Sequence, residues 1–132
     1  MQLDHVGIAV SDLANAVKRW RSILGAPSGE PEEVPSNRVR VTFLEAGEPH
    51  IELLEPMDPD SPVARFLASR GEGLHHLAFR VPSVDRALDD LARQGERVVD
   101  RTGRPGARGR RVGFAHPSAF GGVLVEFVEV PP

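Results

Sequence analysis

Two stretches of the sequence decide the fold: Leu3-Asp-His-Val-Gly-Ile-Ala-Val10 and Leu74-His-His-Leu-Ala-Phe-Arg-Val81. They begin 71 residues apart (3 and 74) in a chain of 132 residues. In each stretch apolar residues alternate with small or polar ones, which is the period of a half-buried β-strand. Identical residues recur at this offset, namely Leu3/Leu74, His5/His76, Val10/Val81 and Ala16/Ala87. We therefore interpret the chain as two copies of one structural unit.

An amphipathic helix is expected after each of these strands. In the first copy Ser11 is the predicted N-cap, and Gly25 is the predicted stop. In the second copy Ser83 and Gly95 have the same two roles. A shorter helix is expected to begin at Asp60-Ser61-Pro62, because proline is favoured at the first helical position.

Further strands are expected after each helix, at about 39–45 and 49–55 in the first copy and about 97–100, 110–115 and 122–130 in the second. The segments Pro27–Asn37 and Thr102–Gly109 are rich in Pro, Gly and Arg and are predicted to be loops. Because strands outnumber helices, the fold class is predicted to be α+β with mainly antiparallel pairing. One domain, residues 1–132, would then consist of module 1 (about 1–70) and module 2 (about 71–132).

Composition excludes several classes of function. The chain has no Cys, which excludes disulfides, iron–sulfur clusters and thiolate zinc sites. The net charge of -3 gives no general attraction for nucleic acid, so no nucleic-acid partner is expected. No apolar run approaches the roughly 20 residues that a membrane span needs, and the N-terminus does not resemble a secretory signal, so we expect no membrane association and a cytoplasmic location.

Four polar residues lie opposite the apolar face of predicted strands: His5, Glu52, His76 and Glu126. An unpaired buried carboxylate costs several kcal/mol, so two of them beside two imidazoles suggest a shared neutralising partner. Two neutral His and two carboxylates would balance one divalent cation, and this donor set suits Zn, Fe, Co, Ni or Mn. A single strand His is often half-exposed and a single strand Glu often faces solvent. Recurrence of the pair in both copies favours the metal site.

These residues carry a family resemblance. The chain resembles the vicinal-oxygen-chelate, or glyoxalase-like, superfamily over essentially its whole length, and within it the methylmalonyl-CoA epimerase family. Besides the two opening stretches, the matching blocks are Ile51-Glu-Leu-Leu-Glu-Pro56 with the following Asp60-Ser-Pro62, Gly106-Ala-Arg-Gly109, Phe114-Ala-His-Pro117 and Gly121-Gly-Val-Leu-Val-Glu126. The superfamily fold implied is two tandem βαβββ modules that form a curved, mostly antiparallel half-barrel around a metal.

The resemblance implies an enzyme that interconverts the (R) and (S) forms of methylmalonyl-CoA by proton abstraction through a metal-stabilised enolate. The family's metal ligands correspond to His5, Glu52, His76 and Glu126, and Glu126 would be ligand and base together. Glu52 is the expected second base. The family is commonly dimeric, so a homodimer is expected.

The chain departs from the family pattern at two places. Some epimerases carry a catalytic Glu on the strand before Glu52, where this chain has Val41-Thr42-Phe43 with no acid. The usual Lys after His-Pro is Ser118, which removes one candidate phosphate contact. Arginines around the Gly-rich loop could instead hold the phosphates of coenzyme A, with Arg104, Arg108 and Arg110 as the chosen candidates and a merely solvated loop as the alternative.

Two other functions stay open at this point. A glyoxalase I-like lactoylglutathione lyase would use the same His/Glu/His/Glu site and a similar proton transfer. A metal-free small-molecule-binding module would share only the fold. The late epimerase-like blocks argue against the first, and the four intact ligand positions argue against the second.

Overall fold

The computed structural model describes residues 1–45 and 47–130, and the chain divides into two compact units. The N-terminal unit consists of His5–His75. The C-terminal unit consists of Met1–Asp4 together with the chain from His76 onward. No helix in the described ranges is long and apolar enough to cross a membrane.

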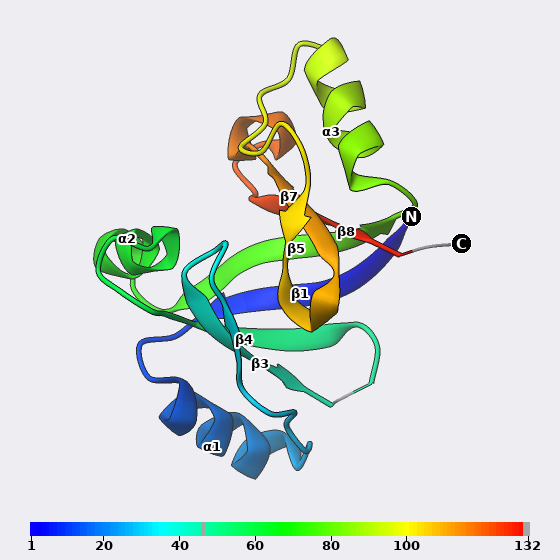
Figure 1. The fold of residues 1–132 in the computed structure, drawn as a ribbon. Helices are drawn as coiled ribbons and strands as arrows, with labels where there is room; N and C mark the ends of the chain where they lie inside the picture. The colour runs from blue at the N-terminus through cyan, green and yellow to red at the C-terminus, as the bar shows by residue number, and fades with distance from the viewer. Residues whose placement is uncertain (46, 131–132) are drawn as a thin grey trace. The chain divides into compact units, whose positions relative to one another are not determined.

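The N-terminal unit has the element order β-α-β-β-β, followed by a further helix. Its elements are β1 (Gln2–Ala9, which starts in the other unit), α1 (Leu13–Leu24), β2 (Glu32–Val34), β3 (Val39–Leu44), β4 (His50–Pro56) and α2 (Pro62–Arg70). The strands lie in the order β2-β3-β4-β1, with β1 parallel to β4 and the other two pairings antiparallel. Helix α1 packs against β3 and β4 (Figure 1).

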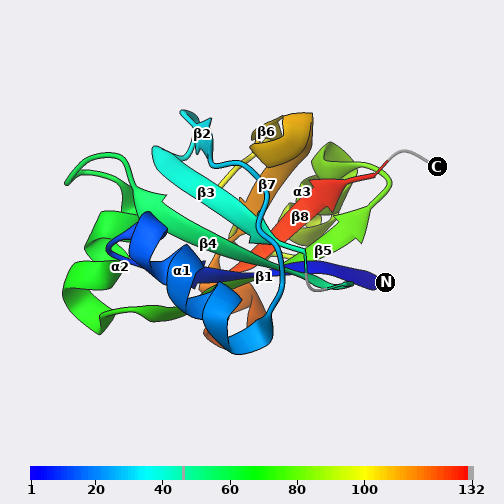
Figure 2. The ribbon, with the colours of Figure 1, turned by 90° about the horizontal axis from the view of Figure 1, so that it is seen from below.

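The C-terminal unit repeats this order. Its elements are β5 (Gly73–Val81, which starts in the other unit), α3 (Val84–Arg93), β6 (Arg104–Pro105), the 3-10 helix η1 (Ala107–Gly109), β7 (Arg111–Ala115), the 3-10 helix η2 (Pro117–Phe120) and β8 (Val125–Glu129). The strands lie in the order β5-β8-β7-β6, with β5 parallel to β8 and the others antiparallel. Helix α3 packs against β7 and β8 (Figure 2). The predicted α+β class with two βαβββ modules and mostly antiparallel pairing is confirmed.

Each helix buries one face of its own sheet. In the N-terminal unit the buried core residues are Val10, Leu13, Leu44 and Leu53. In the C-terminal unit they are Val81, Val84, Leu88, Ala115, Val125 and Phe127. Because successive strand residues face opposite sides, covering one face with a helix leaves the other face of each sheet for the polar residues of interest.

Two carboxylates at matching positions hold the start of each helix. Glu129 Oε1 on β8 accepts the N–H of Val84, the first residue of α3, at 2.9 Å. Glu55 Oε1 on β4 accepts the N–H of Leu13, the first residue of α1, at 3.4 Å. The first N–H groups of a helix have no partner within the helix, so these bonds satisfy a donor that would otherwise be lost. Both units therefore tie a helix to the last strand of their sheet.

The helix boundaries agree with the sequence predictions except at one cap. Ser83 accepts from Arg86 N and Gly25 closes α1 in the left-handed conformation, as expected. The cap of α1 is Asp12, whose side chain accepts from Asn15 N, and not the predicted Ser11. The Ser11 N–H is instead bound by the Glu72 carboxylate at 2.8 Å, a long-range contact that the local pattern does not contain.

The predicted loops contain short strands, and one predicted strand is absent. Glu32–Val34 and Arg104–Pro105 are edge strands inside segments that were predicted to be loops. Residues 97–100 form only a single bridge, from Val98 to Ala115.

Gly113 on β7 packs closely against α3. A larger residue at this position would require a shift, because its Cβ would lie 2.8 Å from Leu88 Cδ1.

Candidate metal centre and active site

The N-terminal unit brings His5 and Glu52 together on one face of its sheet. Gly7 on β1 pairs with Glu52 on β4, and His5 lies two residues before Gly7, so the two side chains share a face. His5 Nε2 lies 3.5 Å from Glu52 Oε1. Both residues are about 95% buried, with relative exposures of 4% and 5%. The sequence predicted this pair.

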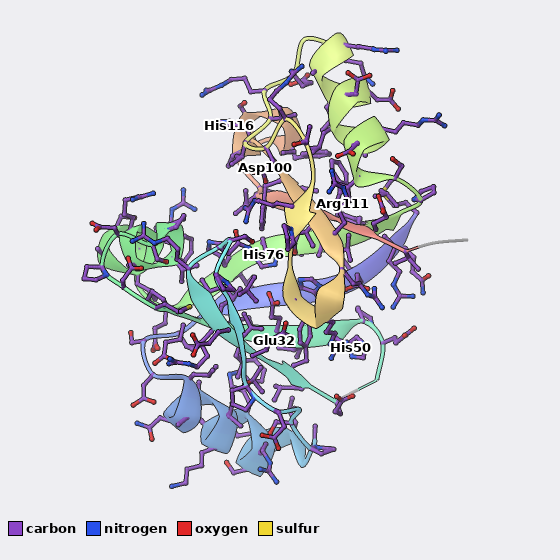
Figure 3. The ribbon with its side chains drawn as sticks, viewed as in Figure 1. Glu32, His50, His76, Asp100, Arg111 and His116 are labelled. Atoms are coloured by element: carbon purple, nitrogen blue, oxygen red, sulfur yellow. The ribbon has the colours of Figure 1, made fainter. Side chains whose placement is uncertain are left out.

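The C-terminal unit repeats the pair with His76 and Glu126. Ala78 on β5 pairs with Glu126 on β8, and His76 lies two residues before Ala78. His76 Nε2 lies 3.2 Å from Glu126 Oε1, and both residues are buried. His76 is labelled in Figure 3. Each unit therefore contains one buried imidazole–carboxylate pair built in the same way.

An aromatic ring supports each pair. Phe43 on β3 pairs with Glu52, and its ring meets the His5 ring edge-on at 5.5 Å between centroids. Phe114 on β7 pairs with Glu126 and meets the His76 ring at 5.6 Å. The sequence reading missed both phenylalanines, although they lie at the same 71-residue offset as the two histidines. Each imidazole therefore packs edge-on against a phenylalanine ring from the strand next to its glutamate.

The donor atoms in each pair fit a shared cation. Two ligand atoms at about 2.0–2.2 Å from one metal ion, at ligand–metal–ligand angles from about 90° (octahedral) to about 109° (tetrahedral), lie about 2.8–3.6 Å apart. The observed separations of 3.5 Å and 3.2 Å agree with this spacing. Neutral imidazole and carboxylate are also common ligands of divalent transition metals. The chemistry and spacing of each pair therefore fit two ligands of a single metal ion.

The arginines of the Gly-rich loop have carboxylate partners. Arg104 Nε lies 3.0 Å from Asp100 Oδ1, and its guanidinium lies over the Phe114 ring at 5.5 Å. Arg110 Nη1 lies 3.2 Å from Oδ1 of the buried Asp4. Figure 3 labels Asp100 and Arg111 in this region. These contacts stabilise the loop, whatever else the arginines bind.

Asp85 at the start of α3 joins both ends of the loop segment 103–111. Its carboxylate accepts the Gly103 N–H at 2.6 Å and contacts Arg111 Nη2 at 2.8 Å and 2.9 Å. The Gly103 N–H and then the Arg111 guanidinium hold the pKa of the Asp85 carboxyl below its ordinary value of 3.8. The charged form is therefore the form that stabilises the fold.

We expect the Asp85→Asn variant to lower the urea midpoint of unfolding at neutral pH. Because the folded pKa lies below the unfolded one, this stabilisation is present above about pH 4 and is lost as the pH falls through the folded pKa. The gap between wild type and variant should therefore shrink in acid, measured by urea titration from pH 7 to pH 3. Asp90→Asn, an exposed change on the same helix, is the control. A gap that is constant with pH would contradict this assignment.

The other three histidines, together with Glu45 and Glu48, lie outside the proposed set of metal ligands. His75 packs edge-on against Phe66 at 4.9 Å between ring centroids. His116 Nδ1 accepts the Ser118 N–H at 3.0 Å as the cap of η2. Glu45 and Glu48 are exposed. His50 is half-buried and lies on the same face of β4 as Glu52.

Comparison with known proteins agrees with this architecture. A family profile described as the Glyoxalase/Bleomycin resistance protein/Dioxygenase superfamily matches residues 4–114. The ethylmalonyl-CoA/methylmalonyl-CoA epimerase of Cereibacter sphaeroides is 41% identical over 132 residues, covering 98% of each chain. The methylmalonyl-CoA epimerase of Bos taurus is 40% identical over 95% of this chain and 72% of its own.

Solved structures give the same result. The crystal structure of methylmalonyl-CoA epimerase from Mycobacterium tuberculosis matches with a TM-score of 0.91 and 40% identity, over 99% of this chain and 89% of that one. A methylmalonyl-CoA epimerase in complex with methylmalonyl-CoA and ammonium matches with a TM-score of 0.91 and 35% identity, over 99% and 98%. The duplicated βαβββ units and these matches together show that the chain belongs to the glyoxalase/bleomycin resistance protein/dioxygenase superfamily.

Proposed function

We propose that the protein is a metal-dependent epimerase that interconverts (R)- and (S)-methylmalonyl-CoA. The observation that carries the proposal is the buried imidazole–carboxylate pair that recurs in both units, at 3.5 Å and 3.2 Å. The similarity to named epimerases over nearly the whole chain supports the choice of substrate. An acyl-CoA is therefore the proposed small-molecule partner.

The proposed metal ligands are His5, Glu52, His76 and Glu126, which would share one divalent cation. Two neutral imidazoles and two carboxylates would give such a site no net charge, which removes the cost of burying either acid. When bound, the cation acts as a Lewis acid that lowers the energy of the enolate of the thioester. Cobalt, nickel, manganese, zinc and iron all accept this donor set.

Glu126 and Glu52 are the proposed bases for the proton transfers. Three carboxylates are buried in the part of the chain that the structure describes, and the third, Asp4, accepts from both Arg80 and Arg110. One glutamate carboxylate would take the proton from the α-carbon, which leaves the electron pair in the enolate. The other glutamate, which must be in its carboxylic acid form at that point, would give its proton to the opposite face of the enolate. The C–H bond is thus broken on one face and formed on the other, and the two glutamates exchange protonation states.

Coenzyme A would be held in part by the Gly-rich loop. Arg104, Arg108 and Arg110 are the proposed phosphate contacts, because guanidinium groups match phosphate oxygens. Arg104 and Arg110 also have carboxylate partners in the C-terminal unit, which would pre-position their guanidinium groups. Arg108 has a left-handed backbone, with φ of 60°, beside the positive-φ Gly109.

The predicted homodimer and the predicted cytoplasmic location also stay predictions.

Two alternatives have the same fold. A glyoxalase I-like lyase would act on a glutathione hemithioacetal with the same acids. A metal-free binding module would need none of the four proposed ligands. The buried pairs in both units disfavour the metal-free module, since an unused buried carboxylate would only cost stability.

Side-by-side turnover tests the proposal. The purified protein, loaded with Co²⁺ or Mn²⁺, is assayed with (S)-methylmalonyl-CoA and with the methylglyoxal–glutathione hemithioacetal. We expect turnover of the thioester and at most traces with the hemithioacetal. Activity on the hemithioacetal alone would overturn the epimerase proposal in favour of the lyase.

A further inference from the structure

His50 lies beside a proposed ligand, on the same face of the sheet. In the register of β1 with β4, His50 is directly opposite His5, and Glu52 follows two residues later on the same side of the strand. His50 is labelled in Figure 3. All three residues belong to the N-terminal unit. The proposed mechanism gives His50 no role.

The His50 ring is enclosed on one side. Its ring meets Phe43 edge-on, 6.3 Å between centroids, and Phe43 also contacts His5 at 5.5 Å. His50 Nδ1 is buried, and it has no hydrogen-bond partner within residues 1–45 and 47–130. Each ring nitrogen of an imidazole is a donor or an acceptor, so a buried one without a partner costs stability. Such a cost is expected where a bound molecule supplies the missing partner.

The fold itself does not require a polar residue at this position. Glu52 and Glu126 are 74 residues apart, as are Glu55 and Glu129, so the counterpart of His50 in the C-terminal unit is Leu124. Leu124 is half-buried and belongs to no strand. The C-terminal unit therefore has an apolar residue at the equivalent position, and the imidazole is specific to the N-terminal unit.

We propose that His50 is a substrate-binding residue whose ring nitrogen hydrogen-bonds the free carboxylate of a malonyl-type thioester. The inference rests on the proposed function. Such a substrate has one thioester oxygen and two carboxylate oxygens beside the α-carbon. If the cation binds one oxygen of each group, a carboxylate oxygen is left, and in a buried site it needs a donor. A hydrogen bond to an ionised oxygen is stronger than one to a neutral oxygen, so His50 would select acyl groups that carry the carboxylate.

Binding of two acyl-CoA ligands separates this role from packing. Malonyl-CoA and propionyl-CoA differ at the acyl group, since only malonyl-CoA carries a carboxylate there. We expect His50→Ala to weaken malonyl-CoA binding by about 10-fold or more, since hydrogen bonds to charged groups are worth at least one factor of ten. Propionyl-CoA binding should change less than about 2-fold. His50→Gln, whose amide can donate, should recover part of the loss. Isothermal titration calorimetry of the metal-loaded protein gives all the affinities.

A matched control is Thr42→Val. The Thr42 hydroxyl is also buried without a partner in the described ranges, but Thr42 pairs with Leu53 and so lies on the helix-covered face. This variant should leave both affinities unchanged. Equal losses for both ligands in His50→Ala, or no loss, would overturn the assignment of His50. If the wild type binds malonyl-CoA but does not epimerise methylmalonyl-CoA, the proposed function fails while the result on His50 still stands.

Discussion

Replacing Glu126 with Gln should slow hydrogen exchange at the α-carbon by about 10²–10⁴-fold for the one epimer of methylmalonyl-CoA whose proton Glu126 removes, which is the usual contribution of a positioned acid or base. The amide keeps the size of the side chain and an oxygen that can bind metal, but it cannot accept the proton. Glu126 is buried beside His76, with 3.2 Å between Oε1 and Nε2, so the substitution removes a base without opening the site. Deuterium uptake from D₂O, followed by mass spectrometry, gives the rate.

Glu129→Gln is the matched control for this experiment. Glu129 is on the same strand as Glu126, three residues later, and binds the Val84 N–H at the start of α3. A glutamine oxygen can accept the same N–H, so this variant should keep the wild-type exchange rate within about 3-fold and unfold at a slightly lower urea concentration. If the Glu126→Gln variant exchanges the α-carbon hydrogen of both epimers at the wild-type rate, Glu126 is not a base.

The two proposed bases can also be told apart from each other. If Glu126 and Glu52 serve opposite faces of the α-carbon, each Gln variant should still exchange the proton of one epimer while it fails to interconvert the two. Chirally pure substrates, assayed separately for exchange and for epimerisation, give this distinction. Loss of exchange with both epimers in Glu126→Gln alone would mean that a single base serves both faces.

Most of the fold follows from short-range patterns in the sequence. The strand period places His5 and Glu52 opposite the helix-covered face, and the 71-residue repeat places His76 in the same environment. Gly25 ends α1 because glycine readily adopts the left-handed conformation, and Ser83 begins α3 because its side chain caps the helix. Both preferences are local and do not depend on the rest of the fold. The two buried pairs could be predicted because the duplication turns two weak signals into one consistent pattern.

The predictions that failed depend on contacts far apart in the chain. The short edge strand Glu32–Val34 exists because β3 offers it free backbone groups, and its own sequence lacks a strand pattern. Asp12 caps α1 by accepting the Asn15 N–H, while the N–H of the predicted cap, Ser11, is bound by Glu72 from far along the sequence.

Metal binding should show whether the two pairs act together. One imidazole and one carboxylate offer two ligands, whereas divalent transition metals bind four to six donors, so a pair alone would hold an ion weakly. If His5, Glu52, His76 and Glu126 share one cation, the protein should bind one divalent ion per chain. At metal concentrations of 100 times Kd, binding should add about 2.7 kcal/mol to the free energy of unfolding, and chelation should remove it.

We expect His5→Ala and His76→Ala each to weaken metal binding by more than about 100-fold, since even residues that only orient a ligand cost 10–100-fold when they are replaced. Either variant should also abolish the rise in melting temperature that added metal gives to the wild type. Two outcomes would contradict a shared site. One is the binding of two ions per chain, and the other is a His5→Ala variant that still binds metal with the wild-type affinity through His76 and Glu126. In that case each unit would have a separate metal site, and Glu52 and Glu126 could not both transfer protons to the same enolate. Metal analysis by inductively coupled plasma mass spectrometry, with thermal unfolding of the same samples, therefore tests the shared site on which the proposed proton transfers depend.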